Sequence, residues 1–201
     1  MKKTLIAIAA AASALTAGTA FAQSFDGTSP WMVRVRAVHL DSENGGAAGD
    51  AGLSINNKWM PEVDVSYFFT PNIAAELVLT YPQKHDVRLG GDKIGTLKHL
   101  PPTLLAQYHF TNFGAFKPYV GAGVNYTNFS SVNLPDGVSI KKNSFGGALQ
   151  LGFDYALDKN WSLNFDVKKV YLGTKVTGAG LENAKFKVDP WLVGVGVGYR
   201  F

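Results

Sequence analysis

The sequence predicts an all-β protein, an eight-stranded antiparallel transmembrane β-barrel with short periplasmic turns and long extracellular loops. Apolar and polar residues alternate through nearly all of the chain after residue 22, and this is the period of a strand that faces two environments. Short and long connections alternate between these segments, as they do in outer-membrane barrels. Aromatic residues gather at both ends of the segments, which is typical of the interfacial girdles of such barrels.

Residues 1–22 are predicted to be a cleaved signal peptide, and residues 23–201 a single transmembrane barrel domain. The basic start Lys2-Lys3 is followed by an apolar stretch over 5–15 and by the small-residue ending Ala20-Phe21-Ala22. The alternative is a first transmembrane helix, but the apolar stretch is short and ends in a typical cleavage site.

The composition narrows the class of protein further. The chain has no cysteine, so an exported form must be stabilised by its fold or by a membrane rather than by disulfides. No run of about 18 apolar residues follows the signal peptide, so a membrane-spanning form has to be a closed barrel. The net charge of +4 includes Lys2 and Lys3, and no basic cluster remains, so we expect no nucleic-acid partner.

Eight segments alternate with a period of two. In the first, Trp31, Val33 and Val35 share one face, whereas Arg34 and Arg36 share the other. The segments cover 31–40, 59–69, 73–81, 103–110, 118–126, 145–155, 161–171 and 191–201. Short turns are expected at 70–72, 111–116 and 158–160, and long loops at about 41–54, 83–95, 130–143 and 173–188.

Two features distinguish a membrane barrel from a soluble one, which would also alternate. The face opposite the apolar one is rich in small residues, which suit the interior of a narrow barrel better than a solvated surface: Gly121, Gly123, Gly146, Ala148, Gly194, Gly196 and Gly198. The apolar face carries two aromatic rings, predicted to be girdles. One ring comprises Trp31, Phe69, Phe110, Tyr155, Trp161 and Tyr199, and the other Trp59, Tyr81, Tyr126, Phe145, Tyr171 and Trp191.

Four segments carry a family resemblance: "HLPPTLLAQYHF" (99–110), "FKPYVGAGVNYT" (116–127), "GFDY" (152–155) and "DPWLVGVGVGYRF" (189–201). In these segments the chain resembles the outer-membrane protein W (OmpW) family, which includes alkane-uptake proteins. The resemblance implies a porin-like barrel in the bacterial outer membrane with a mostly apolar channel for small hydrophobic molecules. Some relatives also act as phage or bacteriocin receptors. The terminal Phe201 matches the usual ending of such barrels, and we interpret it as an assembly signal read by the barrel assembly machinery.

The inward face is predicted to be apolar toward the outside and charged toward the periplasm. The expected channel-lining residues are Val38, Met60, Val78, Leu105, Val170, Leu172 and Leu192. The expected charge network comprises Arg34, Arg36, Glu62, Asp64, Glu76, Asp154, Asp166, Lys168 and Arg200. We interpret these charges as a structural network, because buried charges must pair. An ion-selectivity filter is the weaker alternative in so narrow a barrel.

Three prolines are predicted to interrupt one seam of the barrel. Pro82 follows one segment, and Pro101 with Pro102 precedes the next, so three backbone donors are missing where these neighbours meet. We therefore expect a lateral opening there, through which a hydrophobic solute leaves the apolar lumen for the bilayer. The alternative is that the prolines only end strands above the membrane.

Passive uptake of a small hydrophobic solute is therefore the favoured function, with lipid and solute as partners. A closed structural or adhesive barrel that acts through its loops is the main alternative. A lipid-modifying enzyme would need a Ser/His/acid set, and His39 with Ser42 lacks an orienting partner, so no enzyme activity is expected. His39, His85, His99 and His109 lack metal-ligand spacing, and we expect no metal and no cofactor.

Overall fold

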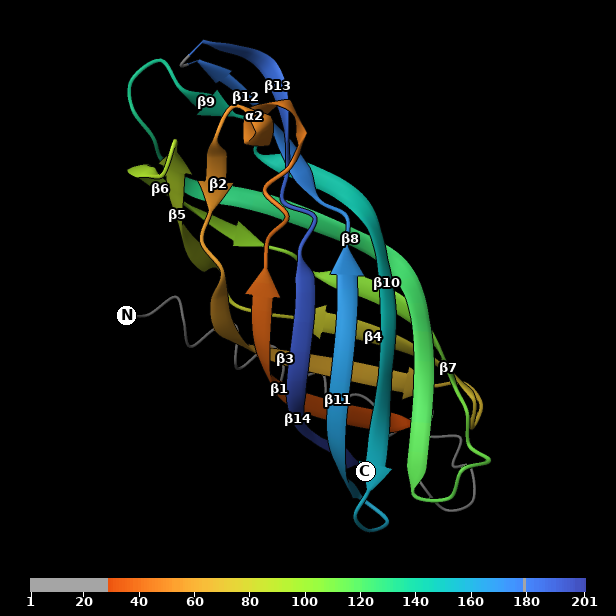
Figure 1. The fold of residues 1–201 in the computed structure, drawn as a ribbon. Coiled ribbons are helices and arrows are strands. Elements are labelled where there is room, and N and C mark those ends of the chain that lie inside the picture. The colour runs from red at the N-terminus through yellow and green to blue at the C-terminus, as the bar shows by residue number, and fades with distance from the viewer. Residues whose placement is uncertain (1–28, 179) are drawn as a thin grey trace.

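The computed structural model describes residues 29–178 and 180–201, so the predicted signal peptide at 1–22 lies outside the described residues. The described part is a tall barrel of tilted strands with a smaller extension at one end (Figure 1). The strands of the barrel wall are β1 (Trp31–Asp41), β3 (Lys58–Phe68), β4 (Ile73–Leu79), β7 (Thr103–His109), β8 (Phe116–Asn133), β10 (Asn143–Ala156), β11 (Trp161–Val170) and β14 (Trp191–Arg200).

These eight strands close into one barrel in the order β1-β3-β4-β7-β8-β10-β11-β14, and β14 returns to β1. Every pair is antiparallel, and β1 closes the ring by pairing Met32 with Arg200 through to Asp41 with Trp191. The predicted eight-stranded antiparallel barrel is therefore confirmed. We call the end with the short turns the lower end and the end with the long connections the upper end.

The two faces of the barrel wall differ as the alternation predicts. The outward face is aliphatic at mid-height, where Val63, Leu77 and Val195 are exposed. Both rings of aromatic side chains lie on this outward face, with Phe69 and Trp161 exposed in the lower girdle. In the upper girdle the exposed aromatics are Trp59, Tyr81, Tyr126, Phe145, Tyr171 and Trp191. An apolar band between two aromatic girdles is the outer surface of a membrane barrel.

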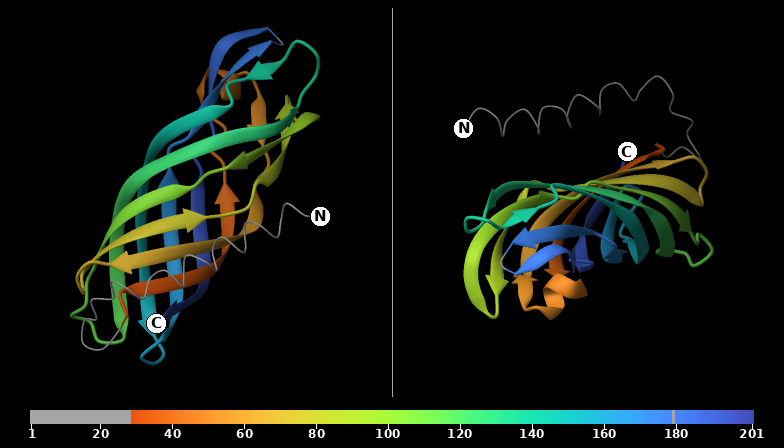
Figure 2. Two further views of the ribbon diagram at one scale, coloured as in Figure 1. Left: turned by 180° about the vertical axis from the view of Figure 1, so that it is seen from behind. Right: turned by 90° about the horizontal axis from the view of Figure 1, so that it is seen from above.

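The long connections between the barrel strands are present, and they contain further strands that are not among the predicted segments. They form β2 (Leu53–Ile55), β5 (Gln83–Leu89), β6 (Asp92–Leu100), β9 (Ser139–Ile140), β12 (Gly173–Gly178) and β13 (Leu181–Lys187), with the short helix α2 (Gly46–Asp50). β6, β5 and β2 extend the barrel sheet from the upper part of β8, and β13, β12 and β9 form a separate three-stranded sheet. Figure 2 shows both sheets at the upper end of the barrel.

The β5–β6 hairpin forms because its sequence also alternates, with polar residues outside. His85 and Val87 are buried, whereas Lys84 and Arg88 are exposed. Gly90 and Gly91 at the tip both have positive φ angles, which a tight hairpin turn requires. This hairpin lies beyond the upper girdle, since it begins after Tyr81. Among the described residues, no helix is long and apolar enough to span a membrane.

Candidate channel lumen

The upper half of the lumen is filled by apolar side chains. All seven predicted lining residues are buried there in one cluster: Val38, Met60, Val78, Leu105, Val170, Leu172 and Leu192. The extension adds Leu53, Val87, Leu97 and Phe186 to the same cluster, so the apolar interior continues past the upper girdle. The apolar path is therefore longer than the sequence indicated.

This upper lumen is closely packed. A cavity of about 10 Å³ lies between Met60, Val78 and Leu172, and one of about 20 Å³ lies higher, between Val87 and Leu97. A cavity of roughly 10–15 Å³ holds one water molecule. Neither of these two cavities has room for a molecule much larger than water.

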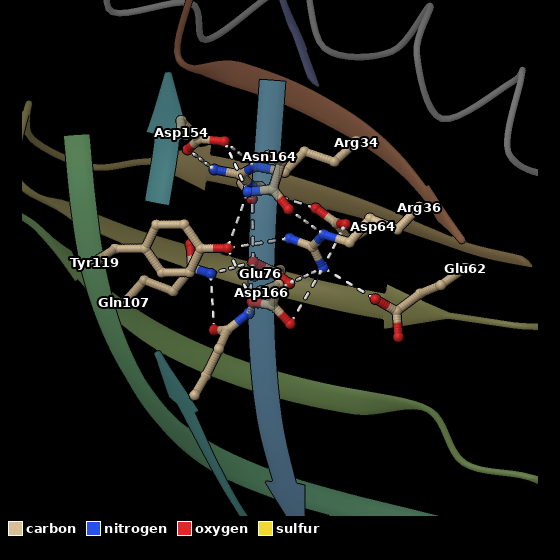
Figure 3. Close-up of polar contacts among 12 residues, drawn as sticks. Arg34, Arg36, Glu62, Asp64, Glu76, Gln107, Tyr119, Asp154, Asn164 and Asp166 are labelled. Carbon is tan, nitrogen blue, oxygen red and sulfur yellow. Dashed lines mark hydrogen bonds and ion pairs between the residues drawn. The ribbon is translucent and has the colours of Figure 1, made fainter. Parts of the chain in front are cut away.

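The lower half of the lumen is filled by charged side chains that point toward one another (Figure 3). Arg34 makes a two-pronged contact with Asp154, with its Nε 3.0 Å from Oδ1 and its Nη2 2.7 Å from Oδ2. Its Nη1 donates to Ser66 Oγ at 2.8 Å and to Asp64 Oδ1 at 3.3 Å. Arg34 is fully buried, so these polar partners replace the water that would otherwise solvate its charge.

Arg36 and Lys168 continue the network toward the middle of the barrel. Arg36 Nη1 lies 3.0 Å from a carboxylate oxygen of both Glu62 and Asp64. Lys168 Nζ lies 2.8 Å from Glu62 Oε1 and 2.5 Å from Asp166 Oδ1. The strand register produces these pairs, because Arg34 lies opposite Asp64 and Arg36 opposite Glu62 across β1 and β3.

Uncharged side chains that are not among the predicted network residues complete the network. The carboxylates Glu62, Asp64, Glu76, Asp154 and Asp166 outnumber the cations Arg34, Arg36 and Lys168. Tyr119 OH and Gln150 Nε2 both donate to Asp166 Oδ2, at 2.9 and 2.7 Å. Gln107 donates to Glu76, and Asn164 Nδ2 donates to Asp154 Oδ1 at 2.9 Å. Tyr119 has the same strand parity as Gly121 and Gly123, and this parity was the signal that could have identified it.

Glycines make room for the large side chains of the network. Gly198 lies opposite Arg34, and Gly196 opposite Arg36, across β1 and β14. A Cβ on Gly152 would lie 2.5 Å from the Tyr119 hydroxyl. Small residues on the inward face are therefore required by the volume of the buried arginine and tyrosine side chains.

Arg200 is the exception among the nine predicted network residues. It lies at the lower rim, half-buried, where its Nε donates to the Ser29 carbonyl oxygen at 2.9 Å and its guanidinium covers the Phe68 ring at 4.2 Å. It forms no ion pair within the described residues. The expected pairing with a lumen carboxylate is absent because the backbone carbonyl and the aromatic face satisfy the guanidinium at the rim.

The network separates the apolar upper lumen from a wide lower cavity. This cavity, of about 350 Å³, is lined by His109, Lys117, Asp154, Trp161 and Arg200, and it reaches the network at Asp154. His109 Nε2 lies 3.0 Å from Gln107 Oε1, so this histidine belongs to the same hydrogen-bonded layer. The lumen thus has an apolar upper part, a charged middle layer and an open lower mouth.

The three prolines lie at a gap between two paired regions. β4 and β7 pair up to Val78 and Thr103, and β5 and β6 pair again from Gln83 and His99. Pro82, Pro101 and Pro102 lie between these pairs, where the two neighbours do not pair with each other. β4 ends and β7 begins at this gap, and β5 and β6 form a second paired region beyond the prolines. Thr80 and Pro101 at this gap also line the 10 Å³ cavity.

The remaining candidate residues lie apart from one another. His39 faces outward against Trp59, with ring centroids 5.2 Å apart, while Ser42 Oγ donates to the Val188 carbonyl oxygen at 3.1 Å. No group of three or more metal-ligating side chains occurs within residues 29–178 and 180–201. Phe201 is exposed at the lower end, and its ring packs on that of Tyr199 at 5.0 Å.

The closed barrel, its two girdles and its charged interior define a small outer-membrane β-barrel protein. The description of the OmpW family matches residues 31–201, and the chain belongs to this family. It therefore resides in the bacterial outer membrane, embedded in lipid, and members of the family are non-enzymatic barrels.

Similar proteins agree in sequence and in structure. The chain is 47% identical to the uncharacterized outer-membrane protein y4mB of Sinorhizobium fredii, over 87% of this chain and 81% of the relative. It is 35% identical to outer membrane protein W of Escherichia coli over the full length of both. It is 31% identical to outer membrane protein AlkL of Ectopseudomonas oleovorans, over 78% and 72%. The crystal structure of OprG from Pseudomonas aeruginosa matches with a TM-score of 0.71 and 30% identity, over 85% and 95%.

Proposed function

We propose that this protein is a passive channel for the uptake of small hydrophobic molecules, which pass through the upper lumen and leave sideways into the bilayer. The observation that carries this proposal is the division of the lumen. An apolar cluster fills most of its upper half, and a buried ion-pair layer fills the level below. The OmpW family membership and the likeness to AlkL support the hydrophobic substrate class.

A hydrophobic solute cannot cross the charged layer at a reasonable cost. To pass straight through, it would have to separate Arg34 from Asp154 and Arg36 from Glu62, and all four side chains are buried. Breaking one buried pair of this kind costs about 3–5 kcal/mol, and an apolar solute offers no replacement partner. The solute therefore has to leave above this layer.

The gap between the β4–β7 and β5–β6 pairings supplies the lateral route. It lies at the level of the upper girdle, directly after Tyr81, and it borders the 10 Å³ cavity at Thr80 and Pro101. Unpaired backbone is costly against lipid and is tolerated where it borders a cavity. Widening this gap requires no ladder hydrogen bond to break, because Pro82, Pro101 and Pro102 have no N–H group to donate.

The test is a chain carrying both Pro101→Ala and Pro102→Ala, which restores two donors at the gap. Uptake of n-octane is measured in vesicles that contain the protein and have lipopolysaccharide in the outer leaflet, with Pro71→Ala in a lower turn as the matched control. We expect the double variant to lose most of its uptake and the control to keep it. Unchanged uptake, together with new cross-strand hydrogen bonds at the gap, would show that the lateral route is wrong.

A closed adhesive barrel is the second candidate, and the small cavities favour it. With only about 10 and 20 Å³ free in the upper lumen, the folded extension could serve as a binding surface instead. The same vesicles distinguish the two functions. A channel raises n-octane uptake above that of protein-free vesicles, whereas a closed barrel leaves it unchanged.

A further inference from the structure

Three buried polar side chains interrupt the apolar upper lumen. Gln83 and His85 on β5 and His99 on β6 all point inward and are fully buried. Gln83 lies directly opposite His99 in the strand register. The rings of His85 and His99 stack with their centroids 4.6 Å apart and their planes 12° apart. The Phe129 ring on β8 lies edge-on to the His99 ring, with the two centroids 6.3 Å apart.

These side chains have unsatisfied hydrogen-bonding atoms. Gln83 Oε1, His85 Nε2 and both ring nitrogens of His99 are buried without a hydrogen-bond partner in the described part of the chain. Buried polar groups are nearly always paired, and leaving one unpaired is destabilising. A cluster of four such atoms in one apolar region therefore needs a polar partner from outside the described chain.

The geometry defines which partner these atoms need. His85 Nδ1 lies 3.0 Å from the Asn56 carbonyl oxygen, so it carries the proton and leaves Nε2 as an acceptor. Gln83 Nε2 donates to the Tyr81 carbonyl oxygen at 3.0 Å, which leaves Oε1 as a second acceptor. A neutral His99 adds one donor and one acceptor. The cluster therefore contains three acceptors and one donor.

His99 is neutral at pH 7. Burial, followed by the nearby His85 and Lys58, lowers the pKa of His99 to about 3, and burial also lowers the pKa of His85. An anionic ligand is disfavoured, because it would bring further acceptors to a site that already has more acceptors than donors. A shared metal ion is disfavoured as well. The lone pair of a ring nitrogen lies in the plane of its ring, and the two rings are stacked in nearly parallel planes. The two lone pairs therefore cannot converge on one metal ion at the usual distance of about 2 Å.

The cluster lies on the path of a solute. Val87 and Leu97, next to His85 and His99 along the inward faces of β5 and β6, line the upper cavity of about 20 Å³. His99 lines the lower cavity of about 10 Å³, which reaches the proline gap. A molecule that moves from one cavity to the other has to pass these side chains.

We propose that Gln83, His85 and His99 form a subsite for the hydroxyl group of an apolar alcohol or phenol. A hydroxyl supplies one donor for the acceptor-rich set and accepts from the single His99 N–H. A pure hydrocarbon would leave all of these atoms unpaired, so the subsite selects hydroxylated solutes over alkanes. This inference rests on the proposed uptake function and names the substrate class within it.

The experiment compares the uptake of 1-octanol and of n-octane in the vesicles described above. The preference of the unmodified protein is the ratio of the two rates, each corrected for protein-free vesicles. We expect His99→Phe to lower this ratio about two- to tenfold, the equivalent of one lost hydrogen bond, while n-octane uptake persists. Gln83→Leu should lower it in the same direction. The control is His39→Phe, the same substitution on the outward face, which should leave the ratio unchanged.

Folding and function are separated by two further readouts. His99→Phe keeps an aromatic ring next to His85 and Phe129 and removes unpaired atoms, so the stability of this variant to urea should not fall. In ¹⁵N spectra of the unmodified protein, 1-octanol should shift the His99 ring nitrogens and n-octane should not. An unchanged uptake ratio in His99→Phe, with n-octane uptake intact, would overturn the hydroxyl subsite and leave the channel standing. No uptake of either probe would overturn the channel, and unshifted ring nitrogens would then overturn the subsite as well.

Discussion

Removal of Asp154 should destabilise the barrel more than removal of any exposed charge. Asp154 receives two hydrogen bonds from Arg34, at 3.0 and 2.7 Å, and it is the only carboxylate with a two-pronged contact to this arginine among the described residues. In Asp154→Ala both bonds are lost, and the guanidinium stays buried because its strand cannot move without breaking the ladders on either side. The bond from Asn164 Nδ2 is lost too, but this amide keeps the Tyr119 hydroxyl and the Phe153 carbonyl oxygen as acceptors.

The size of the effect follows from the partners that remain. Each hydrogen bond to a charged group contributes about 1.5–3 kcal/mol, so the loss of two suggests about 3–6 kcal/mol. Arg34 keeps Ser66 at 2.8 Å and Asp64 at 3.3 Å, and water can reach the vacated position from the lower cavity that borders Asp154. We therefore expect the lower end of that range, about 3 kcal/mol. Asp154→Asn keeps one acceptor and should cost roughly half as much.

The assay is urea unfolding in lipid vesicles, followed by the fluorescence of the four tryptophans. Lys159→Ala in the exposed lower turn is the control, since surface substitutions stay within about 0.5 kcal/mol. A loss below about 1 kcal/mol in Asp154→Ala would refute the reasoning, because the buried charge layer would then not depend on its best-formed pair.

Three further predictions concern packing, permeability and assembly. Gly152→Ala should destabilise the barrel by about 1–3 kcal/mol in the same urea assay, because its Cβ would meet Tyr119 at 2.5 Å, whereas Gly147→Ala, whose nearest contact is 3.8 Å, should be neutral. The unmodified protein should show low ion conductance in planar bilayers because the buried ion pairs fill the lumen, and a large steady conductance would contradict this. Deletion of Phe201 should lower the yield of folded barrel in the outer membrane without changing the uptake per folded molecule, and a normal yield would count against its role as an assembly signal.

The barrel was predictable from the sequence because each strand has one face against lipid and one against a narrow interior. Val33 and Val35 face lipid and Arg34 faces the interior, so the alternation of apolar and polar residues follows the two environments. The β5–β6 hairpin also alternates, but Lys84 and Arg88 on its water-facing side, together with Gly90 and Gly91, resemble a loop in composition.

The candidate site was only partly predictable, for a related reason. The alternation of the sequence shows that Arg34 and Asp64 both point inward. Which inward side chains meet depends on the register between the strands, and the alternation within one strand does not determine that register. Tyr119 lies on a glycine-rich face where a large side chain was not expected, although Gly152 leaves the space that it occupies. The stacked pair of His85 and His99 lies on the β5–β6 hairpin, most of which falls in the predicted loop at 83–95, so no spacing rule could have found it.

At the proline gap, the chain is paired with β8 on one side and is unpaired only on the other. Both β6 and β7 pair with β8, and the Pro102 carbonyl oxygen accepts from the Tyr126 N–H at 3.1 Å, so that this seam continues past the prolines. The opposite seam, toward β4 and β5, has the unpaired stretch. The hairpin is therefore held by β8 along one edge and by the short strand β2 along the other, and a shift of the hairpin relative to β4 breaks no barrel ladder. Any force on the β5–β6 tip, whether from a bound molecule or from a neighbouring protein, would reach the membrane wall along β8.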